Sequence, residues 1–156
     1  ARWVTENPNE KFDDITIEKW YELYEKSIEK FGDCLAYSSD LSAFKNRGGK
    51  LIIDHGIDDP LIPVDNTIDY YEKLIEFFGK PDLGDFVKLY ITPGDGHGTC
   101  LWHGPGITDK DGMTALISWV EKGIAPASIR TVLVNRSGET LRVSAQQPYC
   151  SENNLI

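Results

Sequence analysis

Lys50-Leu51-Ile52-Ile53-Asp54 is the stretch that decides the fold class of this chain. A short aliphatic run between glycines and a polar loop is typical of a strand buried on both faces in a parallel sheet. Phe86 to Ile91 is a second such run, and the segment between the two has the apolar spacing of a helix that ends at Gly79. This order indicates an α/β fold, because parallel neighbours are joined by right-handed crossovers.

Three further segments, residues 16–32, 40–47 and 111–123, have the periodic apolar residues of amphipathic helices. Trp20 and Trp119 lie on the apolar stripes of the first and the last of these helices, so both indoles are expected in the core. The sequence therefore predicts a mostly parallel sheet with flanking helices.

The two ends of the chain differ from this alternation. Residues 1–14 are polar and are expected to form an extended lead-in. Residues 130–150 predict a terminal hairpin and tail, because two strand-like runs flank the turn sequence Asn135-Arg136-Ser137-Gly138. Since no repeat or linker interrupts residues 1–156, we expect them to belong to one domain.

Composition excludes several classes of protein. The 156 residues are 40% hydrophobic, which is enough for one buried core. Sixteen basic and 25 acidic residues give a formal charge of −9, which repels phosphate backbones, so nucleic acid is not an expected partner. No apolar run approaches the roughly 20 residues of a membrane-spanning helix, and we expect no membrane partner either.

Features outside the core favour an exported protein. Cys34, Cys100 and Cys150 are an odd number of cysteines, which leaves one without an internal partner, and three internal pairings stay open. Asn135-Arg136-Ser137 is a sequon for N-glycosylation. The chain opens at Ala1 with no signal-peptide pattern, so we expect an excised segment of a longer protein.

Candidate catalytic residues follow the two predicted parallel strands. Because the carboxyl ends of such strands meet at one edge of a sheet, an acid at Asp58 or Asp59 should lie close to His97. A carboxylate that orients an imidazole, which in turn takes a proton from a nucleophile, makes up two members of a catalytic triad. Acid before histidine is also the chain order of α/β-hydrolases, but the G-x-S-x-G of their nucleophile is absent from this sequence.

A series of short motifs then occurs in one order along the chain. They are the block from Asp40 to Ile52, His55-Gly56 with Asp59-Pro60-Leu61-Ile62-Pro63, Thr67 to Glu72, Pro93-Gly94 with His97, Gly104-Pro105-Gly106, Trp119 to Pro126 and Pro148-Tyr149-Cys150. In this order the motifs resemble the tannase and feruloyl esterase family, and the similarity runs from about Arg2 to Cys150.

The resemblance implies a serine esterase that cleaves phenolic esters of the galloyl, feruloyl or chlorogenate type, with Asp59 as the triad acid and His97 as the base. It implies the C-terminal part of an α/β-hydrolase domain, with the lid and the nucleophile absent from this chain. The N-terminal remainder of the same protein is then an expected partner, and no cofactor is expected. Family members usually carry a bridging cysteine directly after the histidine, whereas this chain has Gly98 there and Cys100 two residues further on.

Several residues near these loops leave alternatives open. Trp102 and His103 are candidates for substrate binding at the mouth of the site, and Trp102 offers a ring face for stacking, although it could equally anchor its own loop. His55 is expected to be packed and hydrogen-bonded. A zinc site that joins the histidines to Asp58 lacks a closely spaced ligand pair, so no metal is expected. A non-catalytic binding module and a different serine hydrolase of the same fold remain alternative functions.

Overall fold

A computed structural model describes residues 2–34, 36–98 and 104–150. The chain consists of two compact units, residues 1–38 and residues 39–156. Residues 36–41, at the junction, contain no helix or strand. The sequence did not indicate this division.

The first unit is helical. It contains α1 (Arg2–Thr5), α2 (Ile17–Phe31) and a 3₁₀ turn, η1 (Gly32–Cys34). The Thr16 hydroxyl caps α2 by accepting a hydrogen bond from the Lys19 amide at 3.2 Å. Lys30 binds the Glu6 carboxylate and donates to the Trp3 carbonyl oxygen at 3.2 Å, which ties α1 to α2. The lead-in, expected to be extended, is therefore helical over α1, and the reason is this contact with a residue far along the chain.

The apolar stripe of α2 is largely exposed, and the prediction of a buried Trp20 is wrong. Trp20 is 48% exposed and stacks on Tyr24, with the ring centroids 5.5 Å apart. A helix buries its stripe only where another element packs against it. Among the described residues of this unit, α1 is the only other α-helix and is four residues long.

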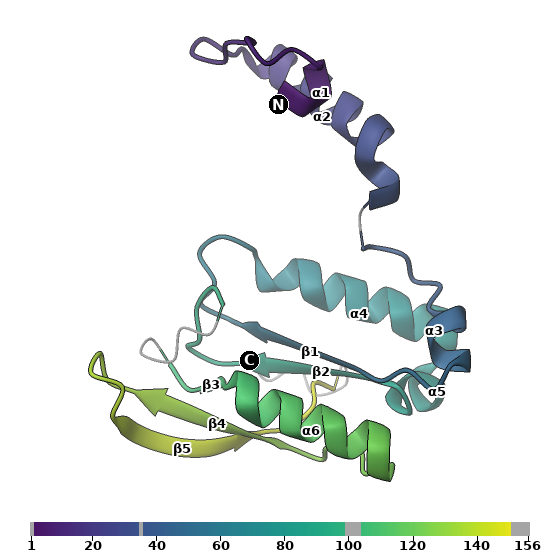
Figure 1. Ribbon diagram of the computed structural model, residues 1–156, viewed down its shortest axis with the longest axis vertical. Coiled ribbons are helices and arrows are strands. Elements are labelled where there is room, and N and C mark those ends of the chain that lie inside the picture. The colour runs from purple at the N-terminus through teal and green to yellow at the C-terminus, as the bar shows by residue number, and fades with distance from the viewer. Residues whose placement is uncertain (1, 35, 99–103, 151–156) are drawn as a thin grey trace. The chain divides into compact units, whose positions relative to one another are not determined.

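The second unit alternates helices and strands (Figure 1). Its elements are α3 (Ser42–Asn46), β1 (Leu51–Gly56), α4 (Val64–Phe78), α5 (Lys80–Gly84), β2 (Val87–Thr92), β3 (Gly106–Ile107), α6 (Asp109–Lys122), β4 (Ile129–Val134) and β5 (Thr140–Gln146). β1 and β2 pair in parallel, from Leu51 opposite Val87 to Gly56 opposite Thr92, as the strand, helix, strand pattern predicted.

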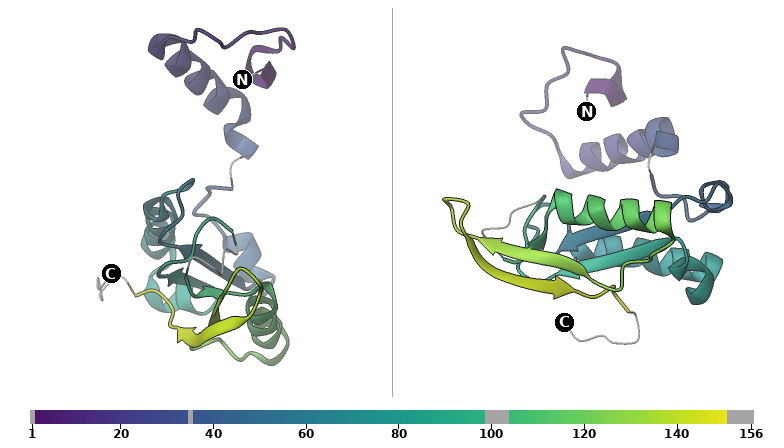
Figure 2. Two further views of the ribbon diagram at one scale, coloured as in Figure 1. Left: turned by 90° about the vertical axis from the view of Figure 1, so that its left-hand side faces the viewer. Right: turned by 60° about the horizontal axis from the view of Figure 1, so that its bottom comes forward.

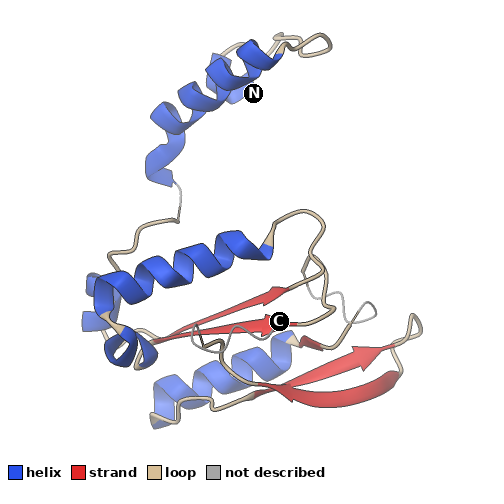
Figure 3. Ribbon diagram, turned by 180° about the vertical axis from the view of Figure 1, so that it is seen from behind, coloured by secondary structure: helices blue, strands red, loops and turns tan. Residues whose placement is uncertain are grey.

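The other strands pair differently. β3, β4 and β5 form an antiparallel sheet in that order (Figure 3), so parallel pairing is limited to β1 and β2 within the described ranges. The terminal hairpin is confirmed, and Gly138 in its turn has φ = +83°, a conformation that glycine adopts without strain. Figure 2 shows the hairpin of β4 and β5 and the tail that follows it. In this tail the Tyr149 amide donates to the carbonyl oxygen of Leu89 in β2 at 2.7 Å.

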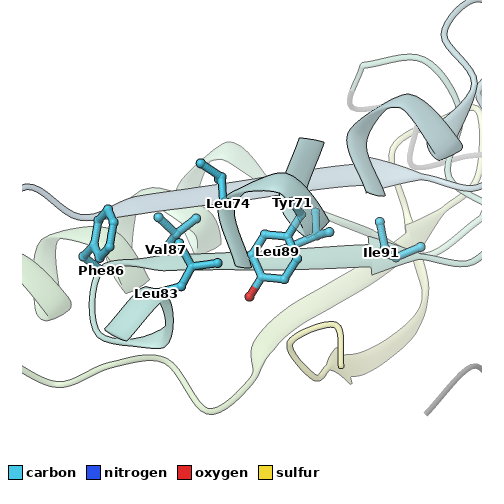
Figure 4. Close-up of a cluster of buried hydrophobic side chains, with 7 residues drawn as sticks. All are labelled: Tyr71, Leu74, Leu83, Phe86, Val87, Leu89 and Ile91. Carbon is cyan, nitrogen blue, oxygen red and sulfur yellow. The ribbon is translucent and has the colours of Figure 1, made fainter. Parts of the chain in front are cut away.

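Helices cover the two faces of β1 and β2. Leu51 and Ile53 of β1 pack against a cluster of buried residues from α4, α5 and β2, which Figure 4 shows. Ile52 of β1 and Ala115 of α6 both pack against a second cluster, which contains Tyr90. Successive side chains of a strand point to opposite faces, so α4 and α6 lie on opposite sides of the pair (Figure 1). This arrangement is the three-layer packing of an α/β fold.

The structure confirms the predicted burial of Trp119 in α6 and corrects the residue at which this helix begins. Trp119 is 2% exposed, as predicted, and the ammonium groups of Lys50 and Lys88 lie 5.4 and 5.7 Å from its ring centroid. The helix begins at Asp109 rather than at Asp111, because the Thr108 hydroxyl accepts a hydrogen bond from the Asp111 amide at 3.0 Å and caps the first turn. Among the described residues, none of the helices combines the length and hydropathy that a bilayer span needs.

Candidate active site

Asp59 and His97 meet beyond the carboxyl ends of β1 and β2. His97 Nδ1 lies 2.8 Å from Asp59 Oδ2, so the predicted proximity of these two side chains is confirmed. A carboxylate only accepts hydrogen bonds, and Nδ1 therefore carries the proton, which puts the lone pair of the neutral ring on Nε2. The Asp59 side chain is 5% exposed and that of His97 is 47% exposed. A buried carboxylate thus orients a more accessible imidazole.

The backbone brings together two loops: the acid loop, residues 57–63 after β1, and the histidine loop, residues 93–98 after β2. Past the strand ends, the Ile57 amide donates to the Thr92 carbonyl oxygen and the Asp58 amide to the Asp95 carbonyl oxygen, both at 3.0 Å. Gly56 is required where the loops cross, because a Cβ at this position would lie 2.1 Å from the Asp95 carbonyl oxygen. The chain therefore places the acid loop directly against the histidine loop.

The hydrogen bonds of Asp59 keep it ionised. Oδ1 accepts from the amides of Leu61 at 2.8 Å and Ile62 at 3.0 Å, and Oδ2 faces His97. Desolvation raises the pKa of Asp59, but the bonds from Ile62, Leu61 and His97 outweigh it and lower the pKa to about 2. Asp58, the alternative acid, is exposed. The geometry therefore selects Asp59 as the partner of the imidazole.

His55 is packed and hydrogen-bonded, as predicted, but its place beside the acid was not foreseen. Its Nδ1 lies 2.7 Å from the Thr67 hydroxyl and its Nε2 lies 3.1 Å from the Ile62 carbonyl oxygen. Nε2 is also 3.5 Å from Asp59 Oδ2. The sequence contains no periodic pattern that marks this position, only a histidine four residues before the acid.

A cavity of about 550 Å³ opens beside this pair. His97, the acid loop, β1 and the first half of α6 line it, with Ile52, Met113 and Leu116 as apolar walls. Asp54 also lines the cavity, and desolvation, together with the nearby Asp109 carboxylate, raises the pKa of Asp54. Polar side chains, among them His97 and several carboxylates, share the lining with these apolar residues. A cavity that combines apolar walls with polar groups beside an imidazole suits a small organic substrate.

The remaining candidates are the two proposed substrate-binding residues, the cysteines and a metal site. Trp102, His103 and Cys100 lie outside the described residues. Cys34 and Cys150 are exposed thiols. Within the described ranges, no group of three or more His, Cys, Asp or Glu side chains is arranged to hold a metal ion.

Comparison with known proteins identifies the family. The sequence profile described as tannase and feruloyl esterase matches residues 3–151. The chain belongs to the tannase and feruloyl esterase family. The prediction of this family from the motifs between Asp40 and Cys150 is therefore confirmed.

Curated relatives of this family member are hydrolases by name. The mono(2-hydroxyethyl) terephthalate hydrolase of Piscinibacter sakaiensis is 43% identical over 94 residues, which are 60% of this chain and 15% of the relative. A probable feruloyl esterase B-2 of Aspergillus terreus is 32% identical over 134 residues, which cover 77% of this chain and 25% of the relative. The chain thus spans a quarter or less of the length of these two relatives.

A solved structure of the family supports the fold. The tannin acyl hydrolase from Aspergillus niger matches with a TM-score of 0.73 and 23% identity, over 96% of this chain and 29% of that one. The predicted α/β-hydrolase fold class is confirmed, and this chain aligns with less than a third of that solved chain.

Proposed function

We propose that this chain supplies the acid and the base of the catalytic centre of a serine carboxylesterase that acts on phenolic esters. The observation that carries the proposal is the 2.8 Å contact between Asp59 and His97 at the carboxyl edge of a parallel strand pair, in a member of the tannase and feruloyl esterase family. Each residue has the surroundings that its role requires: the acid is buried and ionised, and the base is accessible from a cavity.

In the proposed reaction, His97 Nε2 takes the proton of a serine hydroxyl while the serine oxygen attacks the ester carbonyl. The protonated ring then passes this proton to the departing alkoxide, which leaves as the alcohol while the acyl group stays on the serine. His97 next takes a proton from water, the hydroxyl adds to the acyl carbonyl, and the serine regains its proton as the acid leaves. Asp59 stays ionised throughout, holds the ring in the Nδ1–H tautomer and stabilises the imidazolium.

The nucleophile is proposed to come from the N-terminal remainder of the same protein. Two facts support this: no G-x-S-x-G occurs in the sequence, and the matched relatives are several times longer than the part that aligns. The donors of the oxyanion hole are placed outside this chain for the same reason, since one of them is the amide after the serine.

The proposed substrates are galloyl, feruloyl and chlorogenate esters. The names of the relatives support an aromatic acyl group, since they specify a feruloyl ester, a tannin and a terephthalate monoester. The cavity beside His97 has apolar walls at Ile52, Met113 and Leu116 that could receive an aromatic ring. Trp102 and His103 stay in the proposal as substrate-binding residues.

The test uses the full-length protein that contains this chain, assayed on methyl ferulate, methyl gallate, chlorogenate and mono(2-hydroxyethyl) terephthalate. We expect hydrolysis of at least one phenolic ester, loss of it in His97→Ala, and a loss of about 10⁴-fold in Asp59→Asn. Asp58→Asn is the matched control, because this exposed neighbour in the same loop should keep the parental rate. Parental rates from His97→Ala would contradict the proposal, and binding of the esters without any hydrolysis would favour the binding-module alternative.

Export is a separate part of the proposal. Asn135 of the sequon lies in the turn between β4 and β5, where its side-chain amide donates to the Glu139 carboxylate at 3.0 Å. A sequon in a surface turn is where exported proteins carry N-glycans. Protein recovered from culture medium should lose mass on treatment with an N-glycosidase, whereas protein found only inside the cells would contradict export.

A further inference from the structure

Both ring nitrogens of His55 pair with protein groups next to the acid loop. It stands at the end of β1, and its ring reaches two other segments: Nδ1 pairs with the Thr67 hydroxyl in the first turn of α4, and Nε2 pairs with the Ile62 carbonyl oxygen. A carbonyl oxygen only accepts, so Nε2 carries the proton and Nδ1 of the neutral ring accepts from the hydroxyl. One side chain therefore joins the strand, the end of the loop and the helix that follows.

His55 is connected to Asp59 both through the backbone of Ile62 and by a direct approach of the two side chains. The backbone of Ile62 is held twice, because its amide donates to Asp59 Oδ1 and its carbonyl oxygen accepts from His55 Nε2. Nε2 also lies 3.5 Å from Asp59 Oδ2, the oxygen that accepts from His97. The proton on Nε2 thus faces the same carboxylate that orients the base, and both side chains are nearly buried, at 11% and 5% exposure.

We propose that His55 is a positioning residue that holds Asp59 in the orientation its contact with His97 needs; this inference rests on the proposed function. His55 is not placed to exchange protons with a substrate, since both ring nitrogens pair with protein groups. Its lone-pair nitrogen is already occupied by the Thr67 hydroxyl, which also argues against a role as a metal ligand.

Two substitutions of His55 test the contacts of Nδ1 and Nε2 separately. His55→Asn places its amide near the Nδ1 position, so it can still pair with Thr67 but no longer reaches Ile62 or Asp59. His55→Gln extends to the Nε2 position and can still donate to the Ile62 carbonyl oxygen. We expect kcat to fall about 10²-fold in His55→Asn, because a displacement near 1 Å at a catalytic group has about this effect, and to recover most of the way in His55→Gln.

A milder variant covers the case in which His55→Asn does not fold. Thr67→Val removes the hydroxyl that holds Nδ1 and keeps the shape of the side chain, so we expect a several-fold fall in kcat. Thr114→Val is its matched control, because the Thr114 hydroxyl bonds the Lys110 carbonyl oxygen on α6, away from the acid loop. The control should keep the parental kcat.

The measurements are kcat, KM and the thermal unfolding midpoint of the full-length protein and its variants on methyl ferulate or whichever tested ester is hydrolysed fastest. A positioning role predicts a lower kcat with KM and the midpoint close to the parent, and rescue by His55→Gln. Parental kcat in His55→Asn, or an equal loss in the Asn and Gln variants, would overturn the inference while an inactive His97→Ala left the proposed function standing. An active His97→Ala would instead show that the proposed function has failed.

Discussion

Replacement of Gly56 by alanine should separate the side chains of Asp59 and His97. The added Cβ would lie 2.1 Å from the Asp95 carbonyl oxygen and 2.4 Å from its carbon, whereas ordinary contact begins at 3.4 Å. These are backbone atoms, so no side-chain rotation can relieve the clash. The loop that carries Asp59 must then move away from the loop that carries His97 by roughly 1 Å, a displacement that costs about 10²-fold in rate.

The structure also sets an upper limit to the loss of rate in Gly56→Ala. Starting from 2.8 Å, such a movement takes Nδ1 of His97 out of hydrogen-bonding range of Asp59, and full loss of the acid is expected to cost about 10⁴-fold. We therefore expect kcat of Gly56→Ala between these limits, measured as hydrolysis of an aromatic-acid ester by the full-length protein. Gly84→Ala is the matched control, because its Cβ meets open space. A parental kcat in Gly56→Ala would refute the reasoning that the close approach of the loops aligns the pair.

Two further predictions concern stability. Since the pKa of Asp59 is lowered from 3.8 to about 2 in the folded protein, its ionisation stabilises the fold above about pH 4, and this contribution is lost as the pH falls through 2. Urea unfolding should therefore depend more steeply on pH between 4 and 2 in the parent than in Asp59→Asn, and parallel curves would contradict the assignment. Trp119→Ala removes a buried indole and should lower the free energy of unfolding by about 3–5 kcal/mol in urea titration, whereas a change below about 1 kcal/mol would show that this side chain is not a core residue.

The strand pair and its edge could be predicted because their signals are local. The aliphatic runs around Ile52 and Leu89, with a helix between them that ends at Gly79, leave few arrangements other than a parallel pair. The positions of Asp59 and His97 follow from that pairing, because both come directly after the strands. Side chains that follow adjacent parallel strands must share an edge.

The features that sequence reasoning missed depend on which residues come into contact in three dimensions. α1 forms where Lys30 reaches Glu6 and the Trp3 carbonyl oxygen, and no local pattern in residues 1–14 indicates this. Trp20 has the spacing of a core residue, but periodicity does not show what packs against a stripe. A lone histidine such as His55 has no periodic signal, and its link to the acid is visible only in three dimensions.

The most direct test of the central claim is a double-mutant cycle between Asp59 and His97, with kcat/KM measured on the fastest aromatic-acid ester by the full-length protein. If the two side chains act as one unit, His97→Ala should abolish nearly all activity, and the double variant should be no slower than His97→Ala alone. Losses that add across the two positions, or parental activity in His97→Ala, would contradict the account.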